Sequence, residues 1–341
     1  MSGILQGAES EAESAFVGRI DAGLRALFRT VQPVATLPVP GAMAREICLD
    51  AAIEHRALVL IAGADGEALA ATAESLGKEV LRVMVPPGRQ VERAHLIRFL
   101  QGPEVDTVVV AHVESTTGAE APLAELADVL RTRKGIHLFV DASLSLSASP
   151  LETDRWGLDT VLAAGDGALG MPRGISFVAA SARMLTRARS EPGRGRQLDL
   201  VAHHAAAVEG RMLAPLAGPL ARSVEDQLTR LVDAEGLTSR WERHARLRGM
   251  VERWVAERGD VSFVAASGRR ATTLSCLILP RGRRVEPAVA ALAGAQYEVM
   301  IGPRGDAGQY LRISHAGELT LEALAGTLAA IGRELDMAGR E

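Results

Sequence analysis

Apolar runs and helical patterns alternate along the first part of the chain. Short apolar runs bounded by turn residues predict strands near Leu58, Val80, Thr107, Ile136, Asp159 and Ile175. Between the strands lie segments with helical periodicity, such as residues 67–76 and 123–131, and a further helix is expected at residues 19–28. Strands and helices that alternate in this way favour an α/β fold with a mainly parallel sheet.

The pattern changes after residue 222. Val224, Leu228, Leu231 and Val232 follow one another at helical spacing, which predicts a long linking helix that starts at Ser223. Shorter elements come after it: strands at 261–264, 273–279 and 310–314, and helices at 285–292 and 321–335. We therefore expect a large α/β domain over residues 1–222 and a smaller α+β domain over residues 223–341.

Composition narrows the class of protein. The chain has 341 residues, 48% of them hydrophobic, so it can bury a large core. Its formal net charge of −4 argues against a general nucleic-acid binder, despite arginine clusters at 183–196 and 281–284. Residues 1–15 do not resemble a signal peptide, and no apolar stretch is long enough to span a membrane. We expect a cytoplasmic protein that binds neither nucleic acid nor membrane.

Cysteine and histidine offer little chemistry. Cys48 and Cys276 each lie in an apolar run, where a free thiol packs as a small hydrophobic side chain. His203 and His204 form the only adjacent histidine pair, but no acidic or thiol partner lies at ligand spacing. We therefore predict no metal site.

Polar or small residues follow three of the predicted strands. The first strand leads into residues 112–118, His-Val-Glu-Ser-Thr-Thr-Gly; the second ends in Asp141-Ala142-Ser143; and the third leads into residues 165–169, Gly-Asp-Gly-Ala-Leu. Open α/β sheets bind ligands at the carboxyl ends of their strands. The sequence therefore predicts a ligand site at this edge.

These three ordered loops resemble those of the class V aminotransferases of fold type I, in particular the alanine–glyoxylate and serine–glyoxylate branch. In that family the loops typically read His-Gly-Glu-Ser-Ser-Thr-Gly, Val-Asp-Ser and Ser-Gln-Lys-Ala-Leu. The similarity of pattern runs from about residue 20 to about residue 335. It implies the pyridoxal-phosphate transferase fold, with a mainly parallel sheet in the large domain.

The resemblance assigns roles to five residues. Asp141 would pair with the protonated pyridine nitrogen of pyridoxal phosphate, and Thr116 would hydrogen-bond its phenolic oxygen. Gly41 matches the turn that binds the cofactor phosphate. Asp166 stands where the family has glutamine and would also lie at the cofactor site. Arg312 matches the arginine that binds the substrate carboxylate with a bidentate fork, which implies a small carboxylate ligand.

The residue that should form the covalent bond to the cofactor is missing. Gly167 stands at the position of the family's Schiff-base lysine, so we predict no catalytic residue there. The chain contains only two lysines, Lys78 and Lys134. Each precedes a predicted strand, so both are expected at the amino edge of the sheet, away from the predicted site.

Other cofactor contacts are also altered. In the phosphate turn, residues 37–41, two prolines remove backbone N–H donors. The loop at residues 62–68 has no side chain that would stack on the pyridine ring. Residues 217–219, Ala-Gly-Pro, match the segment in which the family's neighbouring subunit supplies a threonine, so that hydroxyl is missing. The amino-terminal arm that crosses to the partner subunit is expected to be absent or very short. No covalent cofactor is therefore expected, although pyridoxal or pyridoxamine phosphate held non-covalently stays open.

Three hypotheses for function follow. The first is a class V aminotransferase homologue that has lost Schiff-base chemistry and acts as a binding, scaffold or regulatory protein, as a homodimer or as a heterodimer with a lysine-bearing homologue. The second is an enzyme that holds pyridoxamine or pyridoxal phosphate non-covalently, or that runs a new reaction in the old carboxylate pocket around Arg312. The third is a pyridoxal-phosphate-dependent alanine or serine–glyoxylate aminotransferase, which requires a different alignment of the loops.

Overall fold

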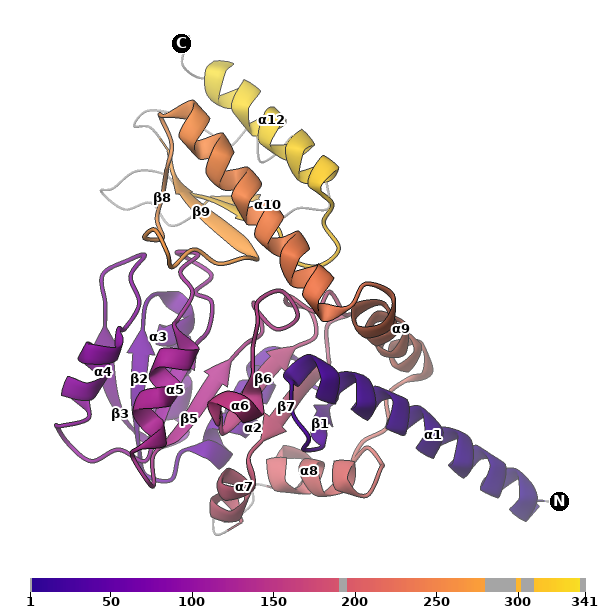
Figure 1. The fold of residues 1–341 in the computed structure, drawn as a ribbon. Helices are drawn as coiled ribbons and strands as arrows, with labels where there is room; N and C mark the ends of the chain where they lie inside the picture. Colours follow the sequence, from indigo (N-terminus) through magenta and orange to yellow (C-terminus); the bar gives the residue numbers. More distant parts are fainter. Residues whose placement is uncertain (1, 190–194, 280–298, 302–309, 338–341) are drawn as a thin grey trace.

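The computed structural model describes residues 2–189, 195–279, 299–301 and 310–337. Its larger sheet has seven strands in the order β1-β7-β6-β5-β4-β2-β3 (Figure 1). Neighbours among β2 to β6 are parallel, whereas β7 runs antiparallel to both β6 and β1. The predicted mainly parallel sheet is therefore confirmed. The strands are β1 (Val34–Leu37), β2 (Arg56–Ile61), β3 (Glu79–Met84), β4 (Thr107–Ala111), β5 (His137–Asp141), β6 (Thr160–Ala164) and β7 (Ser176–Ala180).

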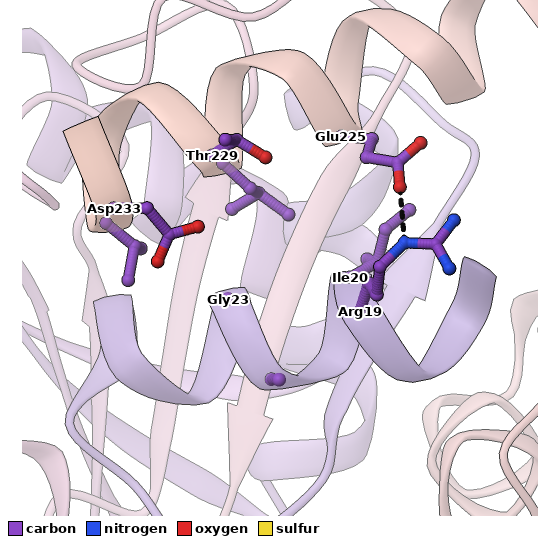
Figure 2. Close-up of a pocket in the computed structure, with 9 residues that line it drawn as sticks. Arg19, Ile20, Gly23, Glu225, Thr229 and Asp233 are labelled. Carbon is purple, nitrogen blue, oxygen red and sulfur yellow. Dashed lines mark hydrogen bonds and ion pairs between the residues drawn. The ribbon is translucent and has the colours of Figure 1, made fainter. Parts of the chain in front are cut away.

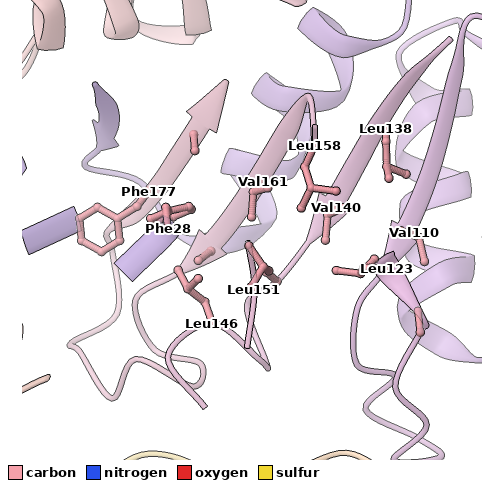
Figure 3. Close-up of a cluster of buried hydrophobic side chains, with 14 of the residues drawn as sticks. Phe28, Val110, Leu123, Leu138, Val140, Leu146, Leu151, Leu158, Val161 and Phe177 are labelled. Atoms are coloured by element: carbon pink, nitrogen blue, oxygen red, sulfur yellow. The ribbon is translucent and has the colours of Figure 1, made fainter. Parts of the chain in front are cut away.

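Helices cover both faces of this sheet, because its central strands carry buried apolar side chains on both sides. Within β4, Val108 and Val110 face a core that contains residues of α1 and α5, which Figure 3 shows in part. Val109 and Ala111 face the opposite core, with residues of α2 and α3. The helices of the large domain are α1 (Ser2–Phe28), α2 (Gly41–Ala52), α3 (Ala64–Ser75), α4 (Arg93–Phe99), α5 (Leu123–Arg131), α6 (Thr153–Trp156), α7 (Ala182–Ala188), α8 (Leu200–Val208) and α9 (Gly218–Thr229), with a short 3-10 helix at Arg196–Leu198.

Two elements at the start of the chain differ from prediction. The first helix begins at Ser2 rather than at residue 19, and its amino-terminal part extends away from the sheet (Figure 1). Alanine and glutamate, both strong helix formers, are frequent before residue 16. The edge strand β1 was not predicted, because four residues are too few to show a period.

The carboxyl-terminal part of the chain forms a second, antiparallel sheet in the order β10-β11-β9-β8. Its core includes Leu247 and Val251 from α10, and Leu328 and Ile331 from α12. The strands predicted at 261–264, 273–279 and 310–314 are present, while the helix predicted at 285–292 lies outside the described residues. The elements are α10 (Leu237–Arg258), β8 (Ser262–Phe263), β9 (Leu274–Ile278), β10 (Val299–Ile301), β11 (Tyr310–Ser314) and α12 (Leu321–Met337).

The predicted linking helix is divided into three parts. Helix α9 continues into a π-helical turn, η2 (Arg230–Ala234), and α10 starts after Gly236, whose φ of 76° suits glycine. Val224, Leu228 and Leu231 pack into the core of the large sheet. The predicted domain boundary at residue 222 lies within α9, and the division into two domains stays a prediction.

Candidate functional site

The carboxyl ends of β4, β5 and β6 lie side by side, and Asp141 is the last residue of the central strand. Its side chain is almost fully buried. Oδ1 accepts a hydrogen bond from the backbone N–H of Ser143 at 2.9 Å. Oδ2 lies 2.6 Å from Nε of Arg45, which donates to it from the first turns of α2. Both oxygens of this carboxylate are therefore bound by the chain's own donors.

Arg45 is the site residue that the sequence prediction missed. The charge of Asp141 is the main cause that raises the pKa of this guanidinium; burial opposes the rise, and Asp65 and Asp166 add to it. Four charged groups thus gather at one edge of the sheet. Arg45 shares a helix face with Cys48 and Leu49, both fully buried, so an arginine in an apolar stripe was the signal that could have revealed it.

The loop after β4 folds back onto the start of α3. The Glu114 carboxylate accepts hydrogen bonds from the backbone N–H groups of Asp65 and Gly66, and so caps the helix amino terminus. The hydroxyl of Thr116 donates to the same carboxylate at 2.9 Å. Burial and the nearby charge of Asp65 raise the pKa of Glu114. The hydroxyl predicted to contact a cofactor is therefore engaged within its own loop.

The predicted phosphate turn packs tightly against the end of β6. A Cβ added at Gly41 would lie 2.8 Å from Cβ of Ala164, so glycine is needed here for close packing. The carbonyl of Val39 accepts a hydrogen bond from the Ser176 hydroxyl at 3.0 Å. Pro40 caps α2 without a side-chain hydrogen bond. Gly41 thus lies at the predicted edge, but in a turn held by contacts within the protein.

Gly167 follows β6 and lies against the loop after β5. A Cβ added at this position would overlap the backbone carbonyl oxygen of Ser143. The same carbonyl accepts a hydrogen bond from the Ala168 N–H at 2.8 Å, which holds the two loops together. Asp166 is partly exposed and forms an ion pair with Arg173 at 3.2 Å. Any residue other than glycine at position 167 would therefore require a shift of the backbone.

Both lysines lie at the opposite edge of the sheet. Lys78 directly precedes β3, and its Nζ lies 3.4 Å from the carbonyl oxygen of Glu54 and 3.9 Å from Oδ1 of Asp50, at the carboxyl end of α2. Lys134 is exposed and precedes β5 by three residues. Strands of five to six residues separate these lysines from the carboxyl edge, a length of about 15 Å.

Arg312 belongs to the second, antiparallel sheet. It lies on β11 opposite Cys276 of β9. The Cys276 thiol donates to the carbonyl oxygen of Ser115 at 3.6 Å. The pKa of this thiol is raised to about 12, mainly because the thiol is buried. The positive charge of Arg312 opposes this rise, and the negative charge of Glu114 adds to it. Arg312 is thus paired with a cysteine that contacts the loop of Glu114 and Thr116, and its role in binding a carboxylate stays a prediction.

A family model described as aminotransferase class-V matches residues 45–278, more than half of the chain. The chain belongs to the class V aminotransferase family. Serine–glyoxylate aminotransferase from Methylorubrum extorquens is 26% identical over 251 residues, which cover 69% of this chain and 59% of that protein. An uncharacterised aminotransferase from Methanocaldococcus jannaschii is 23% identical over 329 residues, covering 93% of this chain and 83% of that one. The resemblance found in the sequence is confirmed.

Solved structures of aminotransferases share the fold. Alanine–glyoxylate aminotransferase from Nostoc sp. superposes with a TM-score of 0.87 at 24% identity and covers 95% of this chain and 88% of that one. Ureidoglycine–glyoxylate aminotransferase from Bacillus subtilis gives 0.87 at 20% identity, with 96% and 86% covered. At these identities the likeness establishes the fold and says nothing of the reaction.

Pyridoxal phosphate, the cofactor that this family implies, does not fit the residues present. A ring nitrogen at Asp141 would meet the guanidinium of Arg45, and Thr116 has its hydroxyl directed to Glu114. Residue 167 has no room for a side chain, and Lys78 is bound at the other edge of the sheet.

A separate surface pocket of about 280 Å³ lies between α1 and the α9–η2 segment. Figure 2 shows Arg19 and Glu225 at one end of it, with their ion pair at 2.6 Å, and Asp233 at the other. None of the residues predicted for the site lines this pocket.

The described part of the chain adds two further observations. None of its helices combines the length and apolar character that a membrane span requires. Nor do its His, Cys, Asp and Glu side chains form any group of three or more that is arranged to hold a metal ion.

Proposed function

We propose that this protein is a class V aminotransferase homologue that has lost Schiff-base chemistry and acts as a binding, scaffold or regulatory protein. The observation that carries this proposal is the position of its lysines. The amine of Lys78 is bound near Glu54 and Asp50 at the amino edge, and Lys134 also precedes its strand. Transamination on this fold needs a lysine amine at the carboxyl edge, to bond the cofactor and to move the proton.

The ligand that we propose for the remaining site is a small carboxylate bound to Arg312. Arg312 lies on β11, near the loop of Glu114, and a guanidinium matches a carboxylate in geometry and charge. We propose further that the protein works in the cytoplasm, as a dimer with a second copy or with a lysine-bearing homologue. Both cysteines are buried and free, which suits a reducing compartment.

An amino-transfer assay tests the proposal. The purified chain is supplied with pyridoxal phosphate, with serine or alanine as donor, and with glyoxylate as acceptor, the compounds that appear in its relatives' names. We expect no glycine above the rate without protein, whereas the Methylorubrum extorquens enzyme under the same conditions forms it. Turnover that disappears in Lys78→Arg or Lys134→Arg would contradict the proposal.

Size-exclusion chromatography with light scattering tests the assembly. A homodimer has twice the chain mass of 36.0 kDa. A stable monomer would argue against self-pairing and leave the lysine-bearing homologue as the proposed partner.

A further inference from the structure

Arg45 and Asp141 form an ion pair between α2 and the end of β5, across 96 residues of sequence. Nε of Arg45 lies 2.6 Å from Oδ2 of Asp141; the Asp141 side chain is 4% exposed and that of Arg45 26%. The second oxygen of Asp141 is bound by the Ser143 N–H. The resemblance to the family implies that Asp141 would pair with the protonated ring nitrogen of the cofactor. In this structure Asp141 pairs instead with the guanidinium of Arg45, from the same chain.

Electrostatics make this pair hard to displace. A carboxylate this well buried is costly without a compensating charge, and a charge-assisted hydrogen bond to a guanidinium provides one. A ligand that binds at Asp141 must first move Arg45 away. Asp65 and Asp166 add negative charge around the guanidinium and so help to retain it. The same negative field disfavours a phosphate group at this edge.

Two further contacts lie in the way of a cofactor. The Thr116 hydroxyl, predicted to bind the phenolic oxygen, donates instead to Glu114. The loop that contains Gly167 is held against the previous loop by the hydrogen bond from Ala168 to Ser143. Contacts within the protein therefore involve all three places that the family uses to bind the cofactor. These are Asp141, which would bind the ring nitrogen, Thr116, which would bind the phenolic oxygen, and the loop of Gly167, where the family has its lysine.

We propose that Arg45 takes the place of the cofactor's ring nitrogen, so that this protein binds neither pyridoxal phosphate nor pyridoxamine phosphate and works in the cofactor-free form. The inference rests on the proposed function and extends it. The absence of a suitable lysine removes only covalent attachment, whereas the Arg45–Asp141 pair also removes non-covalent binding.

Equilibrium dialysis of the full chain against pyridoxamine phosphate tests the inference. This probe carries an amine instead of the aldehyde, so it needs no lysine to bind. We expect no saturable binding up to about 1 mM, while an apo-enzyme of the lysine-bearing family, dialysed in parallel, takes up the probe. Saturable micromolar binding to the wild-type chain would overturn the inference. It would leave the proposed loss of Schiff-base chemistry standing, since that is tested by amino transfer.

A double-mutant cycle tests whether the pair acts as a unit. We expect Arg45→Met to raise the unfolding equilibrium constant at least about tenfold, because it leaves Asp141 buried without a counter-charge. Adding Asp141→Asn to Arg45→Met should recover part of that loss, so that the two changes are not additive. Strict additivity would contradict the inference.

Two more variants make the cycle decisive. Arg82→Met removes a surface ion pair with Glu67 and Glu74, and should change the constant less than about fivefold. If Arg45→Met does not fold, Arg45→Gln takes its place in the cycle, because an amide keeps a donor for Asp141. The dialysis experiment on the wild-type chain depends on neither variant.

Discussion

The backbone carbonyl of Ser143 lies where a side chain on Gly167 would have to begin. Its oxygen accepts the hydrogen bond from Ala168 that joins the loops after β5 and β6. Residue 167 therefore has little room for any side chain. The surrounding backbone has closed to a distance that only glycine permits.

Substitution of Gly167 should consequently fail to restore transamination and should destabilise the fold. We expect Gly167→Ala and Gly167→Lys to lower the free energy of unfolding by about 1–3 kcal/mol, because the new Cβ must push the backbone of Ser143 aside. Urea denaturation measures the change. Gly326→Ala is the control. This glycine lies in the middle of α12 on its exposed side, with no atom near its Cβ position, so alanine should raise the free energy of unfolding by about 1 kcal/mol. A Gly167→Lys variant as stable as wild type that also transaminates would contradict this account.

Arg240 joins α10 to the loops after β5 and β6, and its loss should lower stability strongly. Its side chain is fully buried and donates to Glu235 and Glu318, to the Ser147 hydroxyl, and to the carbonyls of Ala168 and Gly317. We expect Arg240→Met to lower the free energy of unfolding by about 3 kcal/mol, since several acceptors lose their donors at once. Arg240→Lys should recover only part, because an ammonium cannot reproduce the fork of a guanidinium.

The matched control for Arg240 is Arg246→Met on the same helix. Arg246 forms an exposed ion pair with Glu242, so its removal should change the free energy of unfolding by less than about 0.5 kcal/mol. Equal losses in the two variants would show that Arg240 has no special structural role.

The buried His315 should make the protein sensitive to acid. Burial lowers the pKa of this imidazole to about 4, and its ring nitrogens lie 3.0 Å from the Ser275 hydroxyl and 2.8 Å from the carbonyl of Thr272. In the unfolded chain a histidine titrates near 6.5, so the unfolded state takes up the proton first. The stability from neutral His315 is full above pH 6.5 and is lost as the pH falls toward 4.

The pH dependence is measured by urea denaturation between pH 7 and pH 4. His315 should contribute a slope of up to about 1.4 kcal/mol per pH unit, and His315→Gln should remove that part of the slope. An unchanged slope in the variant would mean that His315 does not titrate differently in the folded and unfolded states.

Much of the fold was predictable because the strands are short, apolar and separated by helical patterns. Val108–Ala111 shows why: every second side chain enters one core and the rest enter the other, so the strand appears as a continuous apolar run. Strand ends also indicated the edge where Asp141 and Asp166 lie. The parallel order of the strands was enough to separate Lys78 and Lys134 from them.

The contacts of Arg45 and Arg240 were not predictable, because their partners lie far away in the sequence. Arg45 pairs with a carboxylate 96 residues later, and Arg240 donates to Ser147, 93 residues earlier. The apolar stripe of α2 could indicate that Arg45 is partly buried, but it could not name Asp141 as the partner. The close approach of the Ser143 carbonyl to Gly167 depends on the path of the backbone. Neither the composition nor the periodicity of a sequence reveals that path.

The most direct test of the central claim is borohydride reduction of the protein with pyridoxal phosphate, followed by peptide mapping by mass spectrometry. Mapping separates a lysine adduct from one on the chain's amino terminus. The account predicts no stoichiometric adduct on Lys78 or Lys134, and no imine absorbance before reduction. A stoichiometric adduct on either lysine would contradict it.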